Sequence, residues 1–314
     1  MKLVVLESLG VSEEKMAALC KPFLEEGHEI VCYEKNTDPA VQIERLQDAD
    51  AVLLANMPLS AEVIAAAPKL RYIDIAFTGV DHVAVAKAKE LGMTVSNAAG
   101  YSTEAVAELA LCMMLSLLRF VPEMERRCRA GGTKDGLMGM ELKGKTVGIL
   151  GAGTIGLRVA ELCHAFGCKV LGYRRHVTGN EPSFVQFVSM EELLAQSDIV
   201  SLHCPLNDST RHLMGEAQFA KMKPGAILIN TARGPVVDSQ ALAKALHSGH
   251  LAAAGIDVFD VEPPLATDDV LLTAPNVLAT PHIAFASKEA MEIRAEIVFE
   301  NFRQWLAGTP VNLV

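Results

Sequence analysis

The stretch Gly151-Ala152-Gly153-Thr154-Ile155-Gly156 decides how this chain folds. Residues 145–150 before it form a β-branched, apolar run that is typical of a buried strand, and residues 157–166 after it continue in a helical pattern. Between a strand and a helix, the first glycine allows a tight turn, the second lets backbone amides approach a pyrophosphate, and the third lets the helix pack on the strand. The sequence therefore predicts a dinucleotide-binding turn at a helix N-terminus, with a plain tight turn as the alternative.

Length and composition fit an α/β enzyme. The 314 residues are enough for two domains with sizeable cores, and half of them are hydrophobic while 5% are aromatic. The formal net charge is −10, and no basic cluster offers a surface for nucleic acid. A small anionic substrate gains little from such a field, so an anion site needs its own arginine or backbone amides.

The cysteines and the apolar runs indicate the cellular compartment. The seven cysteines are scattered without a Cys-x-x-Cys pair, which fits reduced thiols in a cytosol. Only four apolar residues separate Met1-Lys2 from Glu7, too few for a signal peptide, and the apolar run 109–118 is half a membrane span. We therefore expect a cytoplasmic protein with no membrane partner.

The first hundred residues alternate strand and helix patterns, which predicts a small doubly wound unit. Its expected strands are residues 3–6, 28–33, 51–54, 71–75 and 93–95, with a helix capped by Ser12 after the first. Thr78, Gly79 and Val80 follow the fourth of these strands. A glycine turn there can present backbone N–H groups to a ligand, and a purely structural turn is an equal alternative.

The remaining chain predicts a second, larger unit. A long helix is expected at 102–120, a surface connection at 126–142, and further strands at 168–173, 199–203, 226–229, 253–256 and 277–279. A final helix at 287–306 is expected to return to the first unit. The prediction is an α/β protein with two doubly wound parallel-sheet domains: residues 1–99 with 286–314, and residues 100–285.

Three polar stretches follow strand ends in the second unit, where open α/β sheets bind ligands. They contain Arg233, whose planar fork suits a carboxylate, Glu262, whose backbone is fixed by two prolines, and His282 after an X-Pro turn. Taken singly, these are as well explained by a surface salt bridge, an acidic loop and a structural histidine. Together beside a nucleotide site, they meet the needs of a 2-keto acid reduction.

That reaction assigns each residue a role. Arg233 would clamp the substrate carboxylate and orient the carbonyl, and His282 would protonate the developing alkoxide as general acid. Glu262 would hydrogen-bond the other ring nitrogen and favour imidazolium. No metal ligand is needed or predicted.

The glycine stretch, Thr231-Ala232-Arg233-Gly234, Asp257-Val258-Phe259 with Glu262-Pro263, and Pro281-His282-Ile283 together resemble the motif set of the D-isomer-specific 2-hydroxyacid dehydrogenases. The resemblance implies a Rossmann nucleotide-binding domain inserted in a flavodoxin-like substrate domain, and a homodimer through the former. It makes Arg233, Glu262 and His282 the catalytic trio. It further implies cofactor contacts by Val106, Thr231, Ala232, Asp257 (to the nicotinamide amide) and His203-Cys204-Pro205 (beside the adenosine), and substrate contacts by Thr78, Gly79 and Val80.

Residues 100–108 and 281–290 are similar to the glycerate dehydrogenase, or hydroxypyruvate reductase, branch of that family, although Phe285 stands where many members have tryptophan. The implied reaction converts hydroxypyruvate or glyoxylate to D-glycerate or glycolate. Alternatives are a D-lactate-type acid, a branched 2-hydroxy acid, phosphoglycerate, or an NAD(H)-sensing corepressor-like binding protein.

The strand expected after the glycine turn ends in Tyr173, Arg174 and Arg175. NAD sites usually place an acidic residue there to bind the ribose hydroxyls, about 20 residues beyond the turn. Arg174 occupies that position here, and arginine suits a 2′-phosphate. NADP(H) is therefore favoured over NAD(H), and the alternative is two solvated arginines with NAD still bound.

Overall fold

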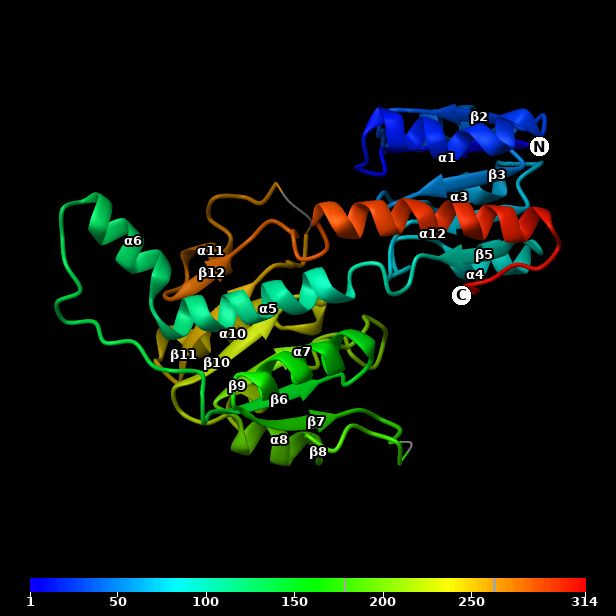
Figure 1. Cartoon of the computed structure of the whole chain (residues 1–314). Helices are drawn as coiled ribbons and strands as arrows, with labels where there is room; N and C mark the ends of the chain where they lie inside the picture. The colour runs from blue at the N-terminus through cyan, green and yellow to red at the C-terminus, as the bar shows by residue number, and fades with distance from the viewer. Residues whose placement is uncertain (178, 262–263) are drawn as a thin grey trace. The chain divides into compact units, whose positions relative to one another are not determined.

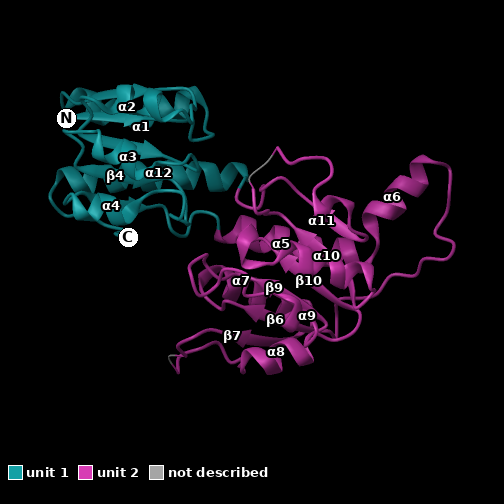
Figure 2. Cartoon of the chain, turned by 180° about the vertical axis from the view of Figure 1, so that it is seen from behind, with its two compact units in different colours: residues 1–102, 286–314 teal, residues 103–285 magenta. Residues whose placement is uncertain are grey.

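The computed structural model describes residues 1–177, 179–261 and 264–314. The chain forms two compact units (Figure 2): unit 1 contains Met1–Ser102 and Ala286–Val314, and unit 2 contains Thr103–Phe285. Each unit is built on one parallel sheet. The predicted fold class, two doubly wound parallel sheets, is confirmed.

Unit 1 has a five-stranded sheet in the order β2-β1-β3-β4-β5. All side chains of β3 and β4 are buried, as expected for central parallel strands covered on both faces. Its strands are β1 (Lys2–Val5), β2 (Glu29–Cys32), β3 (Ala51–Leu54), β4 (Tyr72–Ile75) and β5 (Thr94–Asn97). Its helices are α1 (Glu13–Glu25), α2 (Pro39–Leu46), α3 (Ala61–Ala65), α4 (Val85–Glu90) and α12 (Lys288–Leu306).

The C-terminal helix α12 packs into unit 1 through aromatic side chains. Phe302 lies 5.2 Å from Phe23 of α1, and Trp305 stacks on Tyr72 of β4 at 4.8 Å between ring centroids. Ser287 caps the start of the helix, and its hydroxyl accepts the Ala290 N–H at 3.1 Å. These contacts bury apolar surface that neither segment covers alone.

Unit 2 has a seven-stranded sheet in the order β12-β11-β10-β9-β6-β7-β8. The first strand of the unit, β6, lies between β7 and β9, so the direction of winding reverses at this point. The strands are β6 (Thr146–Leu150), β7 (Lys169–Tyr173), β8 (Val185–Phe187), β9 (Ile199–Leu202), β10 (Ala226–Asn230), β11 (Leu251–Ile256) and β12 (Val277–Ala279).

Helices cover both faces of the unit 2 sheet, and alternate strand residues serve two cores. In β10, Ile227 and Ile229 join the core under α5 and α7, while Ala226 and Leu228 join the core on the opposite face. The helices are α5 (Thr103–Leu118), α6 (Val121–Arg129), α7 (Thr154–Ala165), α8 (Met190–Gln196), α9 (Glu216–Phe219), α10 (Ser239–His247) and α11 (Val270–Thr273), with a short 3₁₀ helix at Gly234–Val236.

Two elements differ from the sequence prediction. The expected connection 126–142 begins inside α6, which projects from the rest of unit 2 (Figure 1); none of its described residues is buried, so it lacks the apolar stripe that marks a packed helix. The edge strand β8 was missed because it spans only three residues.

Of the described helices, none by itself is long and apolar enough to cross a membrane. Together, α5 and α6 have the length and apolar composition of a membrane span, but the two helices are bent by 61° relative to each other.

Candidate active site

The glycine turn joins β6 to α7 and leaves room for a phosphate. Gly151 has a φ of +101°, and a Cβ atom on it would lie 2.5 Å from the Cys204 backbone nitrogen; a Cβ on Gly156 would lie 2.4 Å from the Gly151 carbonyl oxygen. Only glycine fits at both positions. A Cβ on Gly153, in contrast, would meet no described atom within 4 Å. That open space at the N-terminus of α7, where Thr154 and Ile155 begin the helix, fits a dinucleotide pyrophosphate.

The end of β7 is tied to the glycine turn. The Tyr173 carbonyl oxygen accepts the N–H groups of Gly151 at 2.9 Å and Ala152 at 3.1 Å. The Arg174 guanidinium donates to the Ala152 carbonyl oxygen at 3.4 Å and forms an ion pair with Glu181. Sequence reasoning missed Glu181, which lies in an irregular loop with no pattern to mark it.

Arg175 points to a different neighbour, since its guanidinium donates to the Ser209 hydroxyl. Ser209 lies in the loop after β9, the strand on the other side of β6. Both predicted arginines therefore lie at the switch point of the sheet, where such sheets bind nucleotides.

Neutral groups follow β9. Burial lowers the pKa of His203 to about 4, so its imidazole, which shares a 2.8 Å hydrogen bond with the Ser201 hydroxyl, is neutral near pH 7. Burial also raises the pKa of the Cys204 thiol to about 11. Pro205 is exposed. The backbone of His203 and Cys204 packs against Gly151, where it leaves no room for a Cβ atom.

The ends of β10, β11 and β12 are linked to one another. The Asn230 carbonyl oxygen accepts the Asp257 N–H at 3.0 Å, and the Asp257 carbonyl oxygen accepts the His282 N–H at 2.8 Å. A Cβ on Gly234 would lie 1.9 Å from the Phe259 carbonyl oxygen, so glycine is required where the two loops meet. The structure therefore brings the motif residues around Arg233, Asp257 and His282 to one edge of the sheet.

Arg233 is half-buried after β10. The Asn230 side-chain amide donates to the Arg233 carbonyl oxygen at 2.9 Å, while the Arg233 guanidinium donates to the Ala232 carbonyl oxygen at 2.8 Å. The neighbouring Thr231 hydroxyl is buried and has no hydrogen-bond partner among the described residues. A buried hydroxyl without a partner is costly, which fits a bound cofactor supplying one.

Asp257 organises the turn that carries the predicted general acid. Its carboxylate accepts the Thr280 hydroxyl at 2.5 Å, the Ile283 N–H at 2.9 Å and the Ala284 N–H at 2.8 Å. Burial raises the pKa of this carboxyl. Sequence reasoning did not find this role, because the donors lie more than twenty residues along the chain. The predicted contact of Asp257 with the nicotinamide amide stays a prediction.

His282 has a left-handed backbone, with a φ of +56°, which is uncommon for a residue with a side chain. Its ring meets that of Phe285 edge-on, with 5.4 Å between centroids. Such conformations persist only where surrounding contacts hold them, and here the turn is held by Asp257. The position of the imidazole is thus fixed by the fold.

The rest of the predicted site lies on other elements. Glu262 and Pro263 lie outside the described residues, so the pairing of His282 with Glu262 stays a prediction. Val106 is buried in α5 of unit 2. Thr78, Gly79 and Val80 follow β4 in unit 1 and are half-buried.

The loops at the carboxyl edge of unit 1 are also held by side chains. The Asn97 amide donates to the Thr78 carbonyl oxygen at 2.8 Å. Glu7, buried after β1, accepts the N–H groups of Ala55 and Met57 at 2.8 Å each. Sequence reasoning missed Glu7, since a single acidic residue after a strand carries no signal of burial.

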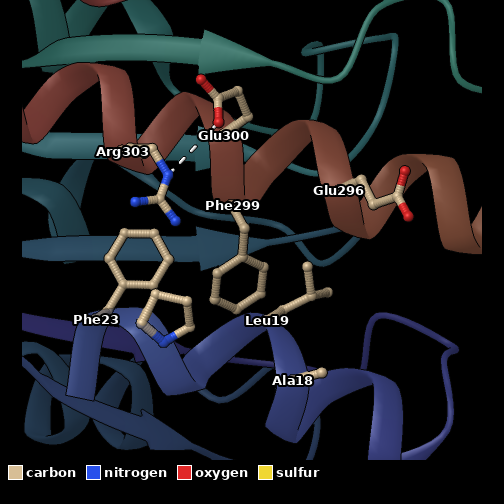
Figure 3. A pocket seen from close by; sticks show the side chains of 8 residues that line it. Ala18, Leu19, Phe23, Glu296, Phe299, Glu300 and Arg303 are labelled. Carbon is tan, nitrogen blue, oxygen red and sulfur yellow. Dashed lines mark ion pairs between the residues drawn. The ribbon is translucent and has the colours of Figure 1, made fainter. Parts of the chain in front are cut away.

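A groove of about 200 Å³ lies between α1 and α12 of unit 1 (Figure 3). The Arg303 guanidinium lies over the Phe23 ring at 4.8 Å and pairs with Glu300 at 3.6 Å. None of the predicted site residues lines it. The lining residues are Ala18, Leu19, Pro22, Phe23, Glu296, Phe299, Glu300 and Arg303.

Comparisons with known proteins agree with this geometry. A family model described as "D-isomer specific 2-hydroxyacid dehydrogenase, NAD binding domain" matches residues 111–284. The chain is 41% identical over 303 residues to a glyoxylate reductase of Korarchaeum cryptofilum, covering 93% of this chain and 91% of the relative. It is 36% identical over 296 residues to a hydroxypyruvate reductase of Blautia hydrogenotrophica, covering 91% and 92%.

A solved structure shows the same fold along the whole chain. An acyclic imino acid reductase in complex with NADPH and D-Arg superposes with a TM-score of 0.90 at 29% identity, covering 100% of both chains.

Proposed function

Because the chain belongs to the D-isomer-specific 2-hydroxyacid dehydrogenases, which are NAD(P)-dependent oxidoreductases, we propose that it reduces hydroxypyruvate or glyoxylate to D-glycerate or glycolate. The observation that supports this most directly is the linked edge of β10, β11 and β12, which gathers an arginine, a buried carboxylate and a histidine. Relatives named glyoxylate reductase and hydroxypyruvate reductase favour this substrate class.

In the proposed reaction, a bound nicotinamide supplies the hydride that adds to the carbonyl carbon. Arg233 holds the substrate carboxylate through two parallel hydrogen bonds and so orients the carbonyl. His282 gives its proton to the carbonyl oxygen as negative charge develops there, and Glu262 favours the protonated ring. Asp257 keeps the His282 turn in place. In the reverse direction, neutral His282 accepts the proton of the hydroxyl.

Each unit receives a role in the proposal. Unit 2 binds the dinucleotide, with the glycine turn at the pyrophosphate and His203-Cys204-Pro205 beside the adenosine. Unit 1 is the substrate domain, and backbone N–H groups of Thr78, Gly79 and Val80 line the substrate carboxylate. The Thr78 hydroxyl is buried without a partner among the described residues, which fits a ligand at this loop.

A nicotinamide dinucleotide is the cofactor of the family, and we propose that this chain prefers NADP(H). Arg174 lies at the end of β7 beside the glycine turn, and Arg175 lies beside the loop after β9. Two cations there suit a 2′-phosphate. The ion pair of Arg174 with Glu181 supports the alternative, in which NAD(H) binds equally well.

We also propose a homodimer through unit 2, in the cytoplasm. Helix α6 and the chain after it project from unit 2 and expose large apolar side chains, of which Met138 is 90% exposed. Such exposed apolar groups favour burial against a second copy. Seven free thiols suit a reducing compartment. Sedimentation velocity of Met138→Ser against the parent tests the dimer, because an unchanged dimer fraction removes this arm from the interface.

The deciding experiment follows the loss of nicotinamide absorbance with a panel of 2-keto acids. Hydroxypyruvate and glyoxylate should turn over at about 1–1000 per second, a range typical of enzymes. Faster turnover of pyruvate, a branched keto acid or phosphohydroxypyruvate would show that the substrate is that acid and not hydroxypyruvate or glyoxylate. Tight dinucleotide binding without turnover of any keto acid would favour the corepressor-like alternative.

A further inference from the structure

The loop after β7 places a carboxylate on the arginine that is assigned to the 2′-phosphate. Glu181 forms an ion pair with the Arg174 guanidinium, and only 9% of the Glu181 side chain and 25% of the Arg174 side chain are exposed. The second carboxylate oxygen of Glu181 accepts the Gly179 N–H at 2.8 Å. Glu181 is therefore held in place at Arg174 by its own loop.

The other contacts of Arg174 fix where this pair lies. One guanidinium nitrogen donates to the carbonyl oxygen of Ala152, inside the glycine turn, at 3.4 Å. The guanidinium carbon lies 5.3 Å from the centre of the Phe187 ring in β8. The ion pair thus lies at the glycine turn itself, where the adenosine end of a dinucleotide would bind.

A 2′-phosphate and Glu181 need the same guanidinium. Both are anions that accept hydrogen bonds from the planar fork, and two anions held side by side repel each other. Because the pair is largely shielded from water, this repulsion is screened less than at an open surface. The neighbouring Arg175 has a neutral partner, the Ser209 hydroxyl, which an incoming phosphate displaces without charge repulsion.

We propose that Glu181 is a specificity-determining residue for the dinucleotide: its carboxylate occupies Arg174 when no 2′-phosphate is bound, and must leave when NADP(H) binds. With NAD(H) the pair stays intact and leaves no uncompensated cation at the ribose. Glu181 therefore lowers the preference for NADP(H) that Arg174 alone would give. The inference rests on the proposed assignment of Arg174 to the 2′-phosphate.

The experiment measures ligand binding by isothermal titration calorimetry, without turnover. The ligands are adenosine 2′,5′-bisphosphate and 5′-AMP, which differ by the 2′-phosphate. The variants are Glu181→Gln, Arg174→Ala and the double variant. Glu191→Gln is the matched control, because Glu191 lies on α8, forms an ion pair with Lys221, and loses the same charge in the variant.

Glu181→Gln should tighten binding of the bisphosphate about five- to twentyfold and leave 5′-AMP within twofold, which is the gain expected from freeing one charge-assisted contact. Glu191→Gln should change neither. In the Arg174→Ala background, Glu181→Gln should have no effect, because the contested guanidinium is gone.

The two assignments fail in different ways. If Arg174→Ala leaves bisphosphate binding unchanged, Arg174 is not the phosphate ligand and the cofactor proposal itself is wrong. If Arg174→Ala weakens binding but Glu181→Gln does not tighten it, the cofactor proposal stands and the competition is refuted. If Glu181→Gln tightens bisphosphate binding equally with and without Arg174, the effect comes from the change in overall charge, and the competition for Arg174 is refuted.

Discussion

The two halves of the carboxyl edge of the unit 2 sheet are built by opposite means. Around β6, β7 and β9, the shape depends on glycines, which have no side chain: Gly151 and Gly156 pack against backbone, and Gly153 leaves open space. Around β10, β11 and β12, it depends on a buried charged group, the Asp257 carboxylate with three donors. The first half offers a cradle for a ligand, and the second fixes a reacting group in one position.

This difference implies that the two halves fail separately when they are mutated. Damage to the glycine turn should weaken cofactor binding, whereas damage to the linked strand ends should reduce turnover. Variants of His282, of the glycine turn and of Asp257 test that separation, and Asp74 of unit 1 provides a buried carboxyl for comparison with Asp257.

His282→Ala should lower kcat for keto-acid reduction about 10²- to 10⁴-fold, the usual contribution of a general acid. Calorimetric cofactor affinity should stay within about twofold, because the imidazole serves proton transfer. His247→Ala is the control, since that ring is bound to the Ala243 carbonyl oxygen on α10. A cofactor affinity that falls in parallel with kcat would show that the two halves of the edge do not act independently.

Gly151→Ala and Gly153→Ala form a matched pair within the cradle. Gly151→Ala forces a Cβ to within 2.5 Å of backbone and strains a φ of +101°, so the free energy of unfolding should fall by more than about 2 kcal/mol. Gly153→Ala should leave that free energy within about 0.5 kcal/mol but weaken cofactor binding, since its methyl fills the phosphate space. Urea unfolding measures the first effect, and calorimetric titration with the cofactor measures the second. If Gly153→Ala binds the cofactor as tightly as the parent, the phosphate does not bind beside Gly153.

Asp257→Asn keeps the size of the side chain and removes an acceptor from the His282 turn. The expected loss is about 1–3 kcal/mol in unfolding free energy, because a buried N–H is left without its partner, and kcat should fall as the turn loosens. Asp260→Asn is the control: it alters an exposed carboxylate that accepts a hydrogen bond from the Ser239 hydroxyl on α10, so neither quantity should change by much. Normal kcat in Asp257→Asn would show that the turn holds without the charge.

Asp74 in unit 1 is a buried carboxyl with weaker hydrogen bonding, since the Asn301 amide donates to it at 3.1 Å. Burial raises its pKa to about 8. The folded state therefore keeps its proton while the unfolded chain loses it above pH 4, so this group costs stability as pH rises from 4 to 8. Asp74→Asn should gain at least about 1 kcal/mol on the parent over that range, in urea unfolding followed by circular dichroism. A constant difference between pH 4 and pH 8 would show that folding does not raise the pKa of Asp74.

The sequence predicts elements that have a local, repeating apolar pattern, and it predicts much less of the contacts between residues that are far apart in the chain. The strands at 51–54 and 277–279 were placed correctly because apolar runs between turn residues are local signals. The partners of Asp257 and Glu181 were not found, since hydrogen bonds between distant loops leave no periodic trace. Helix α6 was also missed, because none of its described residues is buried and therefore no apolar periodicity marks it.

The aromatic stack on α12 allows unit 1 to be followed separately by tryptophan fluorescence. Trp305 is the single tryptophan of the chain, and it stacks on Tyr72 at 4.8 Å in unit 1. Its fluorescence therefore reports the unfolding of unit 1, whereas unit 2 contains no tryptophan and can be followed by the emission of reduced nicotinamide bound to it. The protein thus carries a built-in optical probe that separates the melting of its two units without any label.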